Sequence, residues 1–62
     1  MNLDSKSALR RVNADIRETL RNAAAAIDAG DWGQAHQFYN EATALASSAA
    51  ESAERNAEKE SA

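Results

Sequence analysis

Apolar side chains recur between residues 9 and 27 at the spacing of a helix. Six of them share one stripe: Leu9, Val12, Ile16, Leu20, Ala23 and Ile27. Their mean spacing is 3.6 residues, which is the α-helical period. On a helical wheel they cover an arc of about 80°, which suffices for contact with one neighbouring helix. The pattern predicts a first helix over about residues 4–29.

A second apolar stripe lies between residues 32 and 53 and is wider. Its members are Trp32, Ala35, Phe38, Tyr39, Ala42, Leu45, Ala46, Ala49 and Ala53. They spread over about 140° of the wheel, an arc with room for the first helix and for a further partner. This stripe predicts a second helix over about residues 32–58. Beyond Ala50 this helix has no large apolar side chain, so we expect residues 54–62 to fray or stay disordered.

The segment between the two stripes has the residues of a tight turn. Both glycines lie within four residues at mid-chain, and the chain has no proline. Gly30 suits the left-handed residue that follows a helix end. Asp31 can then cap the second helix, with Gln34 reaching back as in a capping box. Asp4 or Ser5 can cap the first helix by accepting from the free amides of its opening turn.

These elements predict an all-α fold, an antiparallel two-helix hairpin in a single domain of residues 1–62. Folding about Gly30 pairs residues whose numbers sum to roughly 61. Ile16 then meets Leu45, and Val12 meets Ala49. The alanines that recur every seven residues are Ala35, Ala42 and Ala49. Small residues at that interval let two helices approach closely.

The large apolar side chains are too few to stabilise such a hairpin alone. Of 27 hydrophobic residues, 16 are alanine and 11 are larger. Small chains usually depend on disulfides, metals or partner chains, and this chain has no cysteine and a single histidine, His36. We therefore expect no metal and no cofactor. The hairpin should complete a four-helix bundle by association, as a homodimer, or dock a larger protein partner.

Charge is distributed unevenly, with a net +2 over residues 1–21 and −5 over residues 22–62. Four basic residues lie on one side of the first helix: Lys6, Arg10, Arg17 and Arg21. We call them the basic ridge, a candidate anion-binding surface for phosphates or an acidic partner. In the alternative interpretation it is a solvated face, with Arg10 paired to Glu51 and Lys6 to Glu54 or Glu58. The overall charge of −3 argues against general nucleic-acid binding.

The turn and second helix resemble a known repeat over about residues 23–45. Gly30, Trp32, Ala35, Tyr39, Ala42 and Leu45 form the pattern G-x-W-x-x-A-x-x-x-Y-x-x-A-x-x-L. This resembles the turn and second helix of a tetratricopeptide repeat, with Ala23 at the small position of its first helix. It is also similar to the last hairpin of microtubule-interacting-and-transport domains. The resemblance implies a helical hairpin used for protein contacts, although only one copy of the repeat is present.

Catalytic motifs are missing from the sequence. There is no cysteine, no histidine and aspartate pair around a serine elbow, and no glycine-rich phosphate loop. We therefore expect a protein that is not an enzyme. No apolar run approaches the ~18 residues of a membrane span, and the lack of cysteine fits a reducing compartment, so we expect the protein in the cytoplasm.

The residues expected to carry function therefore belong to a protein interface. The predicted interface residues are Trp32, Phe38, Tyr39, Leu45, Ala35 and Ala42. We expect a small non-enzymatic interaction module, such as an adaptor or an inhibitor or antitoxin-like regulator that docks a larger protein. The alternatives are a nucleic-acid-binding or anion-binding regulator that uses the basic ridge, and a tetratricopeptide-like fragment that binds a peptide.

Overall fold

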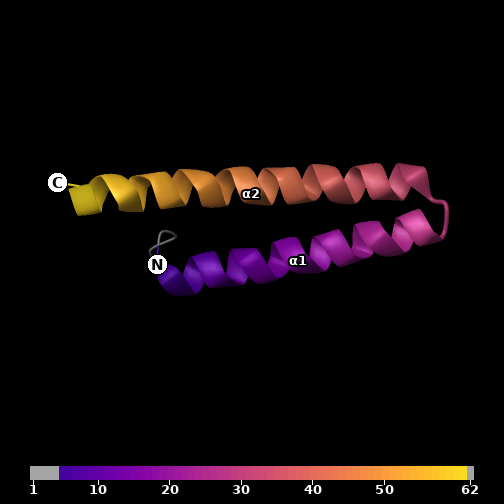
Figure 1. Cartoon of the computed structure of the whole chain (residues 1–62), viewed down its shortest axis with the longest axis horizontal. Helices are drawn as coiled ribbons and strands as arrows, with labels where there is room; N and C mark the ends of the chain where they lie inside the picture. The colour runs from indigo at the N-terminus through magenta and orange to yellow at the C-terminus, as the bar shows by residue number, and fades with distance from the viewer. Residues whose placement is uncertain (1–4, 62) are drawn as a thin grey trace.

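The computed structural model describes residues 5–61, which form two helices and no strand. Helix α1 spans Lys6–Asp28 and helix α2 spans Trp32–Ser61. The helices lie side by side and antiparallel, and α2 extends beyond the start of α1 (Figure 1). The predicted all-α hairpin is confirmed. Residues 54–61 are helical in this structure, so the fraying expected there stays a prediction about the protein in solution, and Ala62 lies outside the described residues.

Helix α1 starts two residues later than predicted, because Ser5 is its cap. The Ser5 backbone is extended, with φ −67° and ψ 155°. Its hydroxyl accepts a hydrogen bond from the backbone N–H of Ala8 at 3.1 Å. This bond satisfies one of the amides that the first helical turn leaves without a partner. Asp4, the other predicted cap, lies outside the described residues.

The turn combines a helix end and a helix start within three residues. Gly30 has φ +73°, the left-handed conformation predicted for it. Its N–H donates to the carbonyl of Ile27 at 3.0 Å, and the N–H of Asp31 donates to the carbonyl of Ala26 at 2.8 Å. These two bonds make a Schellman motif, which satisfies carbonyls at the end of α1. The chain therefore reverses without leaving these backbone groups unpaired.

Asp31 caps α2, as predicted, but half of the predicted capping box does not form. The Asp31 carboxylate accepts from the backbone N–H of Gln34 at 3.1 Å. In a capping box the Gln34 side chain would take the N–H of Asp31. That N–H already donates to Ala26 in the Schellman motif. The turn thus uses the Asp31 amide to end α1 and its carboxylate to begin α2.

The contact between the helices follows a seven-residue repeat. Apart from the half-buried Ala8, the buried or half-buried residues of the helices are Leu9, Val12, Ile16, Thr19, Ala23 and Ala26 in α1, and Ala35, Phe38, Ala42, Leu45, Ala49, Ser52 and Asn56 in α2. Their spacings alternate between three and four, which is the a and d pattern of a coiled coil. We call these thirteen positions the seam. The predicted register agrees with it, because Val12 and Ala49 line one groove together.

Small side chains fill the most buried part of the seam. Ala23 is fully buried, and Ala26, Ala35 and Ala42 are at most 7% exposed. Thr19 is also buried, and its hydroxyl is satisfied because it donates to the carbonyl of Asp15 at 2.8 Å. Within the described part of the chain no large side chain is fully buried. The hairpin is long and thin, 49 × 16 × 16 Å, with a radius of gyration of 14.3 Å, against about 10.5 Å for a compact domain of this length.

Candidate protein-interaction surface

The six predicted interface residues fall into three pairs that differ in their burial. Ala35 and Ala42 are buried in the seam, where they contribute to the hairpin's own packing. Phe38 and Leu45 are half-buried seam residues. Trp32 and Tyr39 are exposed, at 68% and 47% of their surface. Of the six residues, only this last pair is largely exposed to solvent.

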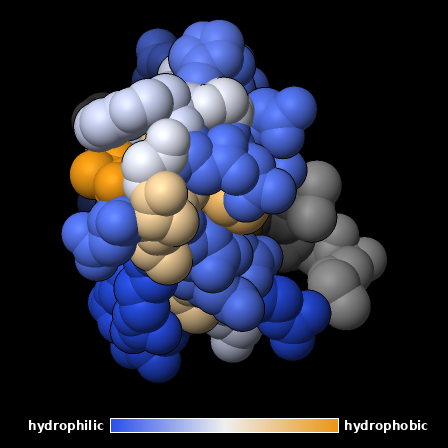
Figure 2. Space-filling view, turned by 90° about the vertical axis from the view of Figure 1, so that its right-hand side faces the viewer, coloured by the Kyte–Doolittle hydropathy of each residue, from blue (hydrophilic) through white to orange (hydrophobic). Residues whose placement is uncertain are grey.

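Two residues of α1 join this exposed pair. Leu20 is 43% exposed and Ile27 is 37% exposed, although the sequence stripe assigned both to contact with the second helix. We call Leu20, Ile27, Trp32 and Tyr39 the apolar face. They are the exposed large hydrophobic residues of the described chain. Viewed from the turn end, most of the surface is hydrophilic, with a small strongly hydrophobic area at the left edge and weakly hydrophobic areas across the middle (Figure 2).

Heptad geometry puts all four residues on the same side of the hairpin. Each of them occupies an e position, the one directly after a d position of the heptad. Leu20 and Ile27 are seven residues apart, as are Trp32 and Tyr39. In an antiparallel pair of helices the two e rows flank the seam on one side and the two g rows flank it on the other. Both helices therefore contribute to the apolar face.

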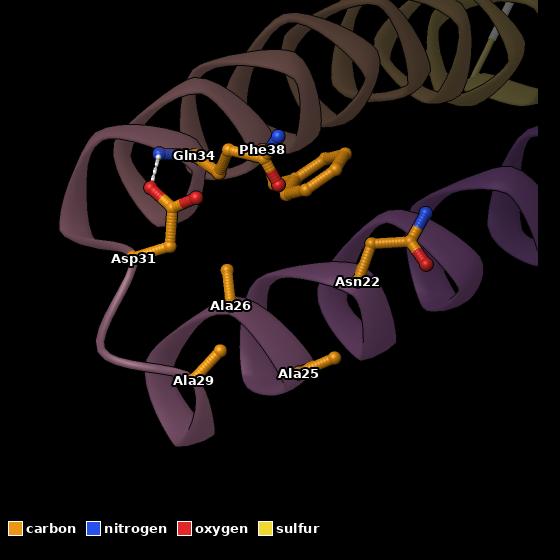
Figure 3. Close-up of a pocket in the computed structure, with 7 residues that line it drawn as sticks. All are labelled: Asn22, Ala25, Ala26, Ala29, Asp31, Gln34 and Phe38. Carbon is orange, nitrogen blue, oxygen red and sulfur yellow. Dashed lines mark hydrogen bonds between the residues drawn. The ribbon is translucent and has the colours of Figure 1, made fainter.

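The opposite side of the seam is more polar and holds a shallow groove near the turn. The groove has a volume of about 270 Å³, and its lining residues are Asn22, Ala25, Ala26, Ala29, Asp31, Gln34 and Phe38. The Phe38 side chain extends from α2 into the space between the helices, and the alanines of α1 lie across this space, nearer the turn (Figure 3). The groove exists because alanines stand where longer side chains would reach across from α1. Its lining has no cluster of charged groups that would fix a ligand.

A second groove of about 280 Å³ lies toward the open end of the hairpin. It is lined by Leu9, Val12, Ser48, Ala49, Glu51, Ser52 and Arg55. The Arg55 guanidinium donates to the buried Ser52 hydroxyl at 3.1 Å. Ser52 faces the seam opposite Leu9, so the small hydroxyl leaves the larger apolar side chain only partly covered. Packing is therefore incomplete toward the open end of the hairpin, as it is in the groove near the turn.

All four side chains of the basic ridge are exposed on α1. Their predicted carboxylate partners on α2, Glu51, Glu54 and Glu58, are exposed as well. The pairing of these groups stays a prediction. An ion pair between exposed long side chains contributes little to stability, because both charges are already well hydrated when they are apart. The ridge is therefore accessible to solvent, but nothing in its geometry selects a particular anion.

Neither helix in the described range is long and apolar enough to cross a membrane. Residues 5–61 also contain no group of three or more histidine, cysteine, aspartate or glutamate side chains arranged to hold a metal ion. His36 is exposed on the first turns of α2.

The fold and the seam define the class of structure as an antiparallel coiled-coil hairpin with one exposed apolar face. Comparison with protein families, with curated proteins and with solved structures finds no match to this chain. The resemblance of residues 23–45 to a tetratricopeptide hairpin therefore stays a prediction.

Proposed function

We propose that this protein is a small, non-enzymatic protein-interaction module that acts through its apolar face. The observation that carries the proposal is the arrangement of Leu20, Ile27, Trp32 and Tyr39. These four large side chains lie together on one side of the hairpin and remain exposed. A partner helix laid along this side would remove them from water, and burial of large apolar side chains is a main source of binding energy.

The packing of the hairpin supports the same proposal. Its buried hydrophobic residues are all alanines, and no large side chain of the described residues is fully buried. Alanine burial removes little apolar area from water, so two helices alone gain little stability. A partner that covers the apolar face would supply the missing burial. An adaptor, or an inhibitor or antitoxin-like regulator, is a role that such a module can fill, and the absence of cysteine is in keeping with the cytoplasm.

The experiment compares two double variants of the chain with the wild type. In the face variant, Leu20→Gln is combined with Tyr39→Gln, which replaces apolar side chains by polar ones of good helix propensity. In the ridge variant, Arg10→Gln is combined with Arg17→Gln. Each tagged chain is used to capture untagged chain and proteins from the native cell, and circular dichroism at the same concentration reports helicity.

We expect the face variant to lose about tenfold or more in retention, because two exposed anchors of an interface each contribute more than about 1 kcal/mol. The ridge variant should retain its partners. Full retention by the face variant would refute the proposal. Loss confined to the ridge variant would favour the anion-binding alternative instead.

The single tryptophan gives a readout that needs no mutation. Trp32 is 68% exposed in the hairpin, so iodide should quench its fluorescence efficiently in the unassociated chain. Association through the apolar face should shift the emission to shorter wavelength and reduce quenching. Unchanged quenching in a verified complex would show that the partner binds elsewhere.

A further inference from the structure

We infer that the partner on the apolar face is a second copy of this chain, stacked so that the two turns lie at the same end. This inference rests on the proposed function and adds the identity and orientation of the partner. The product is a four-helix bundle in which α1 of each copy packs on α2 of the other. The two-fold axis of the bundle runs parallel to the helices.

The hairpin exposes more surface than a compact chain of its mass, and the excess is close to the area that each partner of a stable dimer buries. A compact chain of 6.6 kDa exposes ~3,900 Å², whereas this hairpin exposes 4796 Å². The excess is roughly 900 Å² by the same scaling. A standard protein interface takes about 800 Å² from each partner. Covering one side of the hairpin would therefore bring the chain to the exposure of a compact protein.

The positions of the apolar residues select the orientation. A two-fold axis parallel to the helices preserves each residue's level along the bundle. Leu20 then lies within one helical turn of the level of Tyr39 in the second copy, and Ile27 lies similarly near Trp32 of that copy. With the turns at opposite ends, the apolar turn half of one copy would cover the open half of the other, where Lys6 and Asn13 occupy the e positions of α1.

Charge favours the same orientation. Over Lys6–Asp28, α1 carries five basic and three acidic residues, a net +2; over Trp32–Ser61, α2 carries two basic and five acidic residues, a net −3. With the turns together, each positive helix faces a negative one. With the turns apart, α1 faces α1 and α2 faces α2, so like charges oppose each other.

Spin-label distances can distinguish the two arrangements, because the chain has no cysteine of its own. Single cysteines are introduced at the turn by Gly33→Cys and at the open end by Ser7→Cys, both at exposed f positions. A side chain at residue 33 meets only ordinary contact, with its Cβ 3.8 Å from the Asp31 carboxylate. Sedimentation of the full chain at tens of micromolar reports its mass in parallel.

We expect a mass of twice 6.6 kDa and, for both labels, a distance between copies of no more than twice the 16 Å width of the hairpin. With the turns apart, at least one label would report a distance approaching the 49 Å length of the molecule, and that result would overturn the inference. A helical monomer at these concentrations would also overturn it. The proposed function would still stand in that case if the face variant lost a different captured protein, and it would fail if that variant lost nothing.

Discussion

The same substitution, glycine to alanine, can be made at two positions of the chain that differ in backbone conformation. Gly30 has φ +73° with open space where a Cβ would be placed, whereas Gly33 is helical and a Cβ there meets only the Asp31 carboxylate at 3.8 Å. Gly30→Ala should lower the free energy of unfolding by about 1–2 kcal/mol, the strain of an L-residue in the left-handed region. Gly33→Ala should raise it by up to about 0.5–1 kcal/mol, because alanine loses less backbone entropy in a helix.

The measurement is thermal or urea unfolding of both variants at one fixed chain concentration, since association makes the midpoint depend on concentration. For a domain of this size 1 kcal/mol corresponds to about 4–8 °C in the melting temperature. The melting temperatures of the two variants should therefore differ by well over the experimental error. Shifts of the same sign would refute the reasoning, because steric space is adequate at both positions and only the backbone conformation differs. In particular, a Gly30→Ala variant as stable as the wild type would mean that residue 30 is not left-handed.

Two further pairs of variants test the seam and the cap. Ala23→Leu should destabilise the hairpin by about 1–3 kcal/mol, because Ala23 is fully buried in the seam. Ala24 is exposed one residue later, so Ala24→Leu should stay within about 0.5 kcal/mol of the wild type in the same urea titration. Equal effects of the two leucines would contradict the placement of the seam. Asp31→Ala should cost about 0.5–2 kcal/mol through the lost bond to the Gln34 amide, whereas Asp31→Asn should restore most of the melting temperature. A loss that asparagine does not recover would mean that the carboxylate acts through its charge and not as a cap.

Local sequence signals were enough to predict the hairpin. Alanine and the other helix-forming residues predicted the two helices, while Gly30 and Asp31 predicted where one ends and the next begins. These features depend on backbone conformation and on hydrogen bonds within a few residues, so they can be predicted without knowing how the two helices pack together. The register followed as well, because a turn of known length leaves little freedom in which residues face each other.

Tertiary structure decided which apolar side chains the hairpin buries. The stripe Leu9–Ile27 has a period of 3.6, but two helices in contact over several turns meet along a line of period 3.5. On the wheel the buried residues Thr19, Ala23 and Ala26 centre about 50° away from the middle of that stripe. The seam therefore takes in a threonine and leaves Leu20 and Ile27 exposed.

The apolar face follows from that rotation of α1 about its own axis. A helical wheel shows that α1 has an apolar stripe, but it does not show which edge of that stripe faces α2. Here the turn ends α1 at a position that directs Ala23 and Ala26 toward α2, where small side chains permit close approach. The seven-residue spacing of Leu20 with Ile27, and of Trp32 with Tyr39, was visible in the sequence. That the two pairs lie on the same side of one molecule could be known only after the helices were packed together.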